Sequence, residues 1–442
     1  MIRTKSLLFK IITRSLLVIG AGIGIVFIPN LSLVDEALLP EITEILNKPV
    51  NANIEGNAVY SLYGFAAASD KDPHTVGKAV VEMLQSKHPK GKFAHLTEDE
   101  STSLYGDNKK WDEEWSSLYP ATNCKPRERG NCFELLLAEV KEKPLTHPRL
   151  LTQLERYHRI VQLPHFIEET QLMDYTSPVP NFYLMMQMGK LSQADAYLHN
   201  GLDGLIANSQ ADMQFWRMAL SDSRTLIGRM VAIASLRRSL SALSYALGSE
   251  PHLSQAQETN LRALLAPLKP AEISSKNVLT GELRFGVENA KTAPQKPPED
   301  MLLVWMLSQP TATANWHYRQ SLKPAFALDQ LSPMEFYERA QTSAPSLEFS
   351  RFNPYNLGGK LSLSKNWQYV SYLGRAHDLA GIYLLIALQL ELKINHPENT
   401  GAAVKSSAFR NPYTGKPFDY DSATNSLGFQ CFDVKDVCRI NL

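Results

Sequence analysis

The sequence predicts a mainly α-helical protein with a single N-terminal transmembrane helix, an exported body built as a helical bundle or array, and a small C-terminal β-hairpin. Three observations predict this fold class. A basic stretch precedes an almost uncharged apolar segment at the start of the chain. The middle of the chain repeats apolar residues at helical spacing between prolines. Its end alternates apolar with polar residues around turn-forming ones.

The apolar segment covers residues 15–34. Acidic residues follow it, and the basic residues that precede it are Arg3, Lys5, Lys10 and Arg14. Lysine and arginine are retained on the cytoplasmic side of a membrane, and a spanning helix needs about 20 residues. We therefore expect residues 1–14 to form a cytoplasmic tail and residues 15–34 an uncleaved signal-anchor. The rest of the chain would be exported.

A cleaved signal peptide is the alternative for this segment. The apolar run of residues 16–28 also fits the core of such a peptide, which is about 7–15 residues long. Residues 29–34, however, lack the small residues in an Ala-x-Ala pattern that cleavage requires, and no cysteine follows to carry a lipid. These features favour the signal-anchor.

The composition indicates globular material with no preference for nucleic acid. Hydrophobic residues make up 44% of the 442 residues, and 45 basic side chains balance 45 acidic ones. Nucleic-acid binding calls for a clear basic excess, so we expect no nucleic-acid partner. Because the exported part is longer than the chain that usually folds around a single hydrophobic core, we expect two domains joined by a proline-rich linker. The predicted boundaries are 35–290 for the mainly helical domain, 291–300 for the linker, and 301–442 for a helical region that ends in the hairpin.

The four cysteines fall into two local pairs, Cys124 with Cys132 and Cys431 with Cys438. An even number of cysteines in an exported chain indicates disulfides, and local pairing is the simplest connectivity. Free thiols and a metal site are the alternatives. A zinc site usually has C-x₂₋₄-C spacing, which neither pair shows. We expect two disulfides, an oxidising compartment and no metal.

Helical periodicity is strongest from residue 133 onward. The predicted helices cover residues 77–86, 133–143, 148–163, 193–208, 212–247 (as one helix or two), 254–268, 333–340 and 367–394. Ser254 followed by Gln257 is a capping-box pattern. The apolar run at residues 379–390 falls short of the roughly 18 residues of a second span, so we expect it at the centre of a core.

The end of the chain predicts a β-hairpin. Turn-forming residues fill positions 411–417, and alternating segments at 418–420 and 427–432 flank the turn-rich residues 421–426. The second cysteine pair would fix the tail of this hairpin.

Three large rings, those of Trp111, Trp115 and Tyr119, recur at i, i+4 and i+8. On a helix this spacing places them on one face. We interpret the stripe as core-facing, with a surface for docking a partner or stacking on a sugar as the alternative.

Two polar clusters are candidates for a site. Asp195, His199 and Asp203 share a helix face by spacing and could offer ligands to a metal, but glycines at 201 and 204 interrupt the helix. We interpret this cluster as a solvated face.

The second cluster is Arg375, His377 and Asp378, at the start of the most apolar C-terminal helix. The pKa of a histidine lies near neutrality, so His377 could act as an acid or base. Adjacent helical positions do not face each other, which favours a structural role for the cluster.

The remaining motifs do not predict a reaction. Ser362 and Lys365 match S-x-x-K, but the companion K-T-G and S-D-N elements are missing. There is no H-E-x-x-H, no G-x-S-x-G and no phosphate-binding glycine loop. Five arginines between positions 217 and 238 are expected to be exposed charge, with an anion or acidic-partner groove as the alternative. The catalytic residues stay unknown, and we expect no cofactor.

Three segments resemble an uncharacterised group of bacterial membrane-anchored, mostly helical exported proteins. They are residues 57–65 (Asn-Ala-Val-Tyr-Ser-Leu-Tyr-Gly-Phe), residues 72–77 (Asp-Pro-His-Thr-Val-Gly) and residues 411–418 (Asn-Pro-Tyr-Thr-Gly-Lys-Pro-Phe). The resemblance implies an architecture and no reaction.

We therefore expect a single-pass protein of the bacterial inner membrane, with its N-terminus cytoplasmic and its bulk periplasmic. It would act through protein–protein contacts in envelope assembly or maintenance. Its partners would be the membrane, through residues 15–34, and an envelope protein. The alternative is an envelope hydrolase or lyase, acting on cell wall or polysaccharide, whose site is assembled from residues far apart in the sequence. A ligand-binding sensor is a third hypothesis, but 14 cytoplasmic residues leave no room for a signalling domain.

Overall fold

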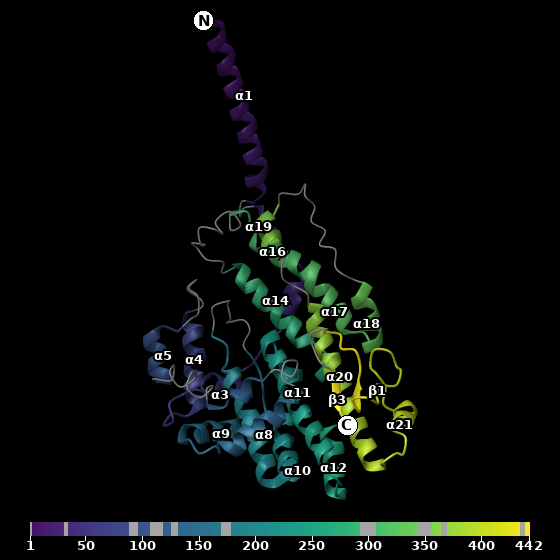
Figure 1. Ribbon diagram of the computed structural model, residues 1–442. Helices are drawn as coiled ribbons and strands as arrows, with labels where there is room; N and C mark the ends of the chain where they lie inside the picture. Colours follow the sequence, from purple (N-terminus) through teal and green to yellow (C-terminus); the bar gives the residue numbers. More distant parts are fainter. Residues whose placement is uncertain are drawn as a thin grey trace. The chain divides into compact units, whose positions relative to one another are not determined.

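The structure of the protein is a computed structural model (Figure 1). It describes residues 2–30, 34–87, 96–106, 118–124, 131–168, 178–291, 306–342, 355–363, 369–433 and 438–442. These residues are mainly helical, as predicted, and form two compact units. Unit 1 comprises Met1–Pro49, Leu283–Pro324 and Ala344–Tyr369, and unit 2 comprises Val50–Glu282, Ala325–Ser343 and Val370–Leu442. The predicted linker at 291–300 lies outside the described residues, apart from its first residue.

Unit 1 contains the N-terminal helix. Its elements are α1 (Ile2–Phe27), the 3₁₀ turn η1 (Ile28–Asn30), α2 (Pro40–Leu46), the second half of α14 (Lys276–Lys291), α16 (Pro310–His317), the π-helical turn η7 (Tyr318–Leu322), the start of α17 (Lys323–Asp329) and α19 (Leu357–Leu363). The segment Ile12–Asn30 is 19 residues long, and none of its most apolar window is buried within the structure. Within the part of the chain that the structure describes, one helix, near the N-terminus, is long and apolar enough to cross a membrane.

The segment that follows this helix is joined to α16 by polar side chains. The carboxylate of Asp35 accepts hydrogen bonds from the backbone N–H groups of Thr311 (2.8 Å) and Ala312 (2.9 Å). These N–H groups lie in the first turn of α16, where they have no acceptor within the helix itself. The fully buried Asn315 accepts a hydrogen bond from the N–H of Leu39 (3.0 Å) and donates to the side chain of Glu36 and the carbonyl of Ala37 (2.8 Å each). We call residues 29–39 the junction segment.

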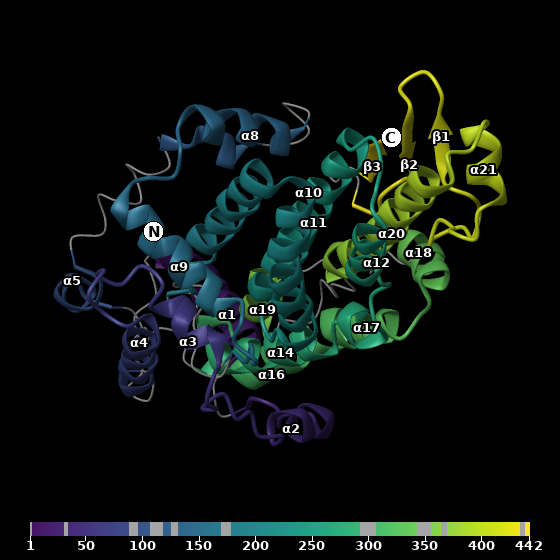
Figure 2. The same ribbon diagram turned by 90° about the horizontal axis from the view of Figure 1, so that it is seen from below.

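Unit 2 is built around two helices, α10 (Phe182–Asp222) and α11 (Leu226–Ser249), which Figure 2 shows side by side. Its other elements are α3 (Ala58–Tyr63), α4 (Pro73–Lys87), α5 (Glu98–Tyr105), η4 (Pro120–Asn123), α8 (Cys132–Glu142), α9 (Pro148–Ile160), α12 (Gln255–Leu264), α13 (Pro270–Ile273), most of α17, α18 (Pro333–Thr342), α20 (Tyr369–Asn395) and α21 (Thr400–Ser406). The predicted capping box at Ser254 is confirmed, since its side chain accepts from the N–H of Gln257 and the Gln257 side chain accepts in return. The apolar run in α20 is buried, as predicted.

The helix predicted at residues 193–208 is wrong in one respect, because a reversal lies inside it. Gly201 has φ +57° and ψ −145°, a backbone conformation that favours glycine, and Asn200 is also non-helical. The two arms of α10 therefore fold back on each other. For residues 212–247 the alternative of two close helices is confirmed, since α10 ends at Asp222 and Thr225 caps the start of α11.

A three-stranded antiparallel sheet lies near the C-terminus. The predicted hairpin is confirmed as β1 (Asp419–Asp421) and β2 (Ser426–Gly428), with Tyr420 opposite Leu427. A third strand, β3 (Arg439–Asn441), pairs with β2 and was not predicted. Three residues are too few to show alternation, so its sequence carries no strand signal.

The crossing of α3 and α4 yields a test of the packing in unit 2. A Cβ atom added to Gly77 would lie 1.6 Å from the carbonyl oxygen of Tyr60. Overpacking a core costs about 1–3 kcal/mol, and here the obstacle is backbone, so Gly77→Ala is expected to lower the free energy of unfolding by at least that much. Urea denaturation followed by circular dichroism measures the change.

Gly248→Ala is the matched control. Gly248 is a helical glycine with open space around the added Cβ atom. The substitution should be neutral or stabilise the protein by up to about 1 kcal/mol, because alanine favours helix over glycine. Equal effects of the two substitutions would contradict the close helix crossing.

Candidate functional site

A polar cavity lies in unit 2 beside the reversal of α10. Its volume is about 580 Å³, within the roughly 300–1,000 Å³ typical of small-molecule sites. The residues that line it come from α9 and both arms of α10: Leu154, His158, Ser192, Asp195, Ala196, His199, Asn200 and Asn208. Two of the residues predicted from the sequence, Asp195 and His199, are among them.

Two glycines explain why these residues meet. Gly201 allows the chain to reverse, and Gly204 allows the second arm of α10 to approach the first, since a Cβ atom there would lie 2.3 Å from the carbonyl oxygen of Ala196. The close packing brings Asn208 of the second arm against Ser192 of the first.

A hydrogen-bond chain crosses the cavity wall. The side-chain amide of Asn208 donates to the hydroxyl oxygen of Ser192 (2.6 Å), and this oxygen lies 3.2 Å from Nε2 of His158 on α9. Partial burial lowers the pKa of His158, and the carboxylates of Asp195 and Asp212 act in the opposite direction. The imidazole is therefore neutral at pH 7 and can accept a proton.

The predicted cluster of Asp195, His199 and Asp203 is divided by the reversal. Nδ1 of His199 lies 2.9 Å from the carbonyl oxygen of Asp195 and 3.4 Å from its carboxylate, at the exposed edge of the cavity. Asp203 follows the break and accepts a hydrogen bond from the side chain of Gln257 (3.0 Å). Only the first two residues thus contribute to the cavity.

A buried carboxylate, Asp212, lies beneath the cavity. Its side chain accepts hydrogen bonds from Trp216 (3.0 Å), Ser239 (2.6 Å) and Gln193 (3.3 Å). The hydroxyl of Tyr157 and the guanidinium of Arg238 also donate to it. The sequence neighbours of Tyr157 and Gln193, which are His158 and Ser192, form the cavity wall, so this network positions both.

Of the predicted aromatic stripe, the structure describes Tyr119 alone. Trp111 and Trp115 lie outside the described residues. Tyr119 is buried, and its hydroxyl donates to the carbonyl of Pro144 (3.3 Å).

The cluster at the start of α20 holds the C-terminal segment. Asp378 accepts hydrogen bonds from the hydroxyl of Tyr413 (2.7 Å) and from the backbone N–H groups of Phe432 (2.8 Å) and Asp433 (3.2 Å). Arg375 forms an ion pair with Asp433 (2.8 Å). His377 is buried against Phe336, and burial, with a smaller effect of Arg229, lowers its pKa to about 4. Its ring is therefore neutral.

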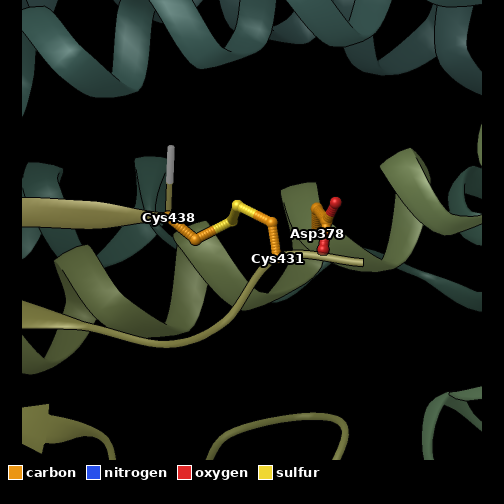
Figure 3. A group of neighbouring side chains, drawn as sticks. All are labelled: Asp378, Cys431 and Cys438. Atoms are coloured by element: carbon orange, nitrogen blue, oxygen red, sulfur yellow. A yellow bond between two sulfur atoms is a disulfide. The ribbon is translucent and has the colours of Figure 1, made fainter. Parts of the chain in front are cut away.

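Both predicted cysteine pairs are at disulfide distance, Cys124 with Cys132 and Cys431 with Cys438. Figure 3 shows the second bond beside Asp378, with which the two sulfur atoms form a compact group. Sulfur atoms bonded to each other are not thiolate ligands, and the Asp378 oxygens already accept hydrogen bonds. This group fixes the end of the chain and does not offer a metal site.

Two buried carboxylates meet at the start of α11. Glu168 accepts hydrogen bonds from the N–H groups of Arg224 (2.8 Å) and Thr225 (3.0 Å), and Glu282 accepts one from Leu226 (3.0 Å). Burial raises the pKa of Glu168, and burial together with the Glu168 charge raises the pKa of Glu282 to about 7. Glu282 thus titrates near neutral pH.

Sequence reasoning missed His158, Ser192 and Asn208. Each stands in an unremarkable helical segment, and only the reversal at Gly201 brings them together. Comparisons of the chain with protein-family models, with curated proteins and with solved structures found no match.

Glu282 predicts how stability depends on pH. The pKa of Glu282 rises from 4.5 to about 7 on folding, so the folded protein binds this proton more tightly than the unfolded chain. The resulting stability is present below pH 4.5 and is lost as the pH rises to about 7; the loss is roughly 3 kcal/mol at most. Chemical denaturation at pH 5 and pH 8 measures it.

Glu282→Gln should keep the acceptor for Leu226 and remove this part of the pH dependence. Glu335→Gln is the control, because Glu335 is an exposed cap whose pKa is lowered by hydrogen bonds to Ser332. If Glu282→Gln left the difference in free energy of unfolding between pH 5 and pH 8 unchanged, the group responsible for this difference would not be Glu282.

Proposed function

We propose that this chain is a membrane-tethered protein of the bacterial envelope that acts through protein–protein contacts, in assembly or maintenance of the envelope. Residues 15–34 would cross the inner membrane with the N-terminus in the cytoplasm, and the bulk of the chain would lie in the periplasm.

The proposal rests on the hydrogen bonds that join the junction segment to the rest of unit 1. The carbonyl of Pro29 accepts a hydrogen bond from the side chain of Gln309 (3.3 Å), and Asp35 and Asn315 continue the contact along residues 35–39. A signal peptide that is removed leaves no part in the mature fold. A segment that forms specific contacts up to the end of the apolar helix supports a permanent, short tether.

Two further features support the proposal. Disulfides persist in oxidising compartments, which fits an exported body. A junction without a long flexible linker would keep unit 1 next to the membrane surface, where a partner anchored in the same membrane could be met repeatedly.

The proposal predicts a stoichiometric envelope partner. The intact, tagged protein would be cross-linked briefly in its own membranes, extracted in mild detergent and captured, and the captured proteins identified by mass spectrometry. We expect one partner at a molar ratio near that of the bait. We also expect this partner to be lost when residues 1–34 are replaced by a cleavable signal. Recovery of the protein alone would contradict a role through protein contacts.

The junction segment has its own test. Asn315→Ala leaves the half-buried N–H of Leu39 without its acceptor, which costs about 1–2 kcal/mol, in the lower part of the range for buried groups. If local opening exposes the junction, protease should release the body from membranes about 5–30-fold faster. Immunoblotting of the soluble fraction over time measures the release.

Asn277→Ala is the matched control, since Asn277 is exposed and belongs to unit 2, where its side chain donates to the carbonyl of Ser221 (2.9 Å). Its release rate should equal that of the unchanged protein. Equal rates for all three proteins would show that the junction contacts do not protect the tether.

A further inference from the structure

We propose that Ser192 is the nucleophile of an acyl-transfer site that hydrolyses uncharged esters, with His158 as its general base. This inference goes beyond the tethering role and does not depend on it. It gives the hydrolase alternative a concrete site.

The order of donors along the hydrogen-bond chain directs the hydroxyl proton of Ser192 toward His158. Asn208 donates to the hydroxyl oxygen of Ser192 at 2.6 Å, so this bond does not use the hydroxyl proton. Nε2 of His158, 3.2 Å away, is placed to accept that proton, with the ring's own proton on Nδ1. A nucleophile within hydrogen-bond reach of a base is the arrangement that activates a hydroxyl.

Two carboxylates near His158 favour its protonated form. Asp195 lies one helical turn after Ser192 on the same arm of α10, and its carboxylate favours the protonated form of His158, as does Asp212 below. These charges stabilise the imidazolium that forms as Ser192 attacks. Two carboxylates around a neutral imidazole therefore favour proton transfer from the serine.

The reaction balances with water as the only second substrate. The hydroxyl oxygen of Ser192 bonds to the acyl carbon while its proton passes to His158. The C–O bond of the ester breaks, and the leaving alkoxide takes the proton from His158. A water molecule then gives a proton to His158 and attacks the acyl carbon; Ser192 leaves with that proton, and the carboxylic acid is released.

Asn208 is a positioning residue. Its amide nitrogen holds the hydroxyl oxygen of Ser192, and its buried side-chain oxygen has no hydrogen-bond partner among the residues that the structure describes. Because this oxygen is buried, a molecule in the cavity does not reach it, and Asn208 acts on the reaction through Ser192.

The charge of the cavity sets the substrate class. Among the described residues, its lining holds one carboxylate, Asp195, and neither lysine nor arginine. A negatively charged acyl group would be repelled by Asp195 without a described lysine or arginine to offset it, whereas a neutral one would meet amide, hydroxyl and apolar groups. The volume of about 580 Å³ accommodates a small-molecule ester.

The test treats the full-length protein, purified in mild detergent, with a fluorescent fluorophosphonate, followed by peptide mass spectrometry. We expect one adduct, on Ser192, and none in Ser192→Ala. In His158→Gln, labelling should slow by about 10²–10⁴-fold, the usual contribution of a general base. Ser249→Ala is the control, because Ser249 is a helical serine whose hydroxyl donates to the carbonyl of Tyr245 (3.0 Å); it should label like the unchanged protein.

Hydrolysis of p-nitrophenyl butyrate and of p-nitrophenyl hemisuccinate tests the substrate class, and the neutral ester should be cleaved faster. Failure of Ser192 to label in the unchanged protein, while a known serine esterase in the same sample labels, would overturn the proposal. So would an adduct on another serine, or an unchanged rate in His158→Gln. Equal cleavage of the two esters would overturn the substrate class.

Discussion

The burial of one carboxylate governs the centre of unit 2. Asp212 is 1% exposed, and a buried charge is tolerated only when it is paired and its oxygens accept hydrogen bonds. The donors come from α9, both arms of α10 and α11, including Tyr157, Gln193 and Arg238. Because all of these groups must meet at one point, the register of the helices is fixed there. Apolar packing alone tolerates small shifts, whereas this network does not.

The same principle operates in unit 1. Asp35 and Asn315 are separated by 280 residues in the sequence, yet both act in joining the junction segment to α16. In each unit a polar side chain with several partners selects which distant segments meet, and apolar residues then fill the space between them.

The helices, the hairpin and the capping box could be predicted because their signals are local: apolar spacing, turn residues and the Ser254–Gln257 pattern. The reversal of α10 was harder to predict. Glycines at 201 and 204 predict that the helix is interrupted, but not the direction that the chain takes after the interruption. The pairing of Ser192 with His158 could not be predicted. The two residues lie 34 positions apart, on helices whose contact depends on the buried Asp212 network. A site assembled by tertiary contact leaves no local motif.

The Asp212 network also determines whether His158 can act as a base. An unpaired carboxylate below the ring would hold a proton on His158, and an imidazolium cannot accept the proton of Ser192. The guanidinium of Arg238 donates to Asp212 and carries the opposite charge, so its field at the imidazole offsets part of the carboxylate's. The net attraction between Asp212 and the protonated imidazole is small enough that burial keeps the His158 ring neutral. It is also large enough to stabilise the positive charge that develops on this ring during attack by Ser192. The ion pair that allows Asp212 to be buried thereby also sets the proton affinity of the cavity.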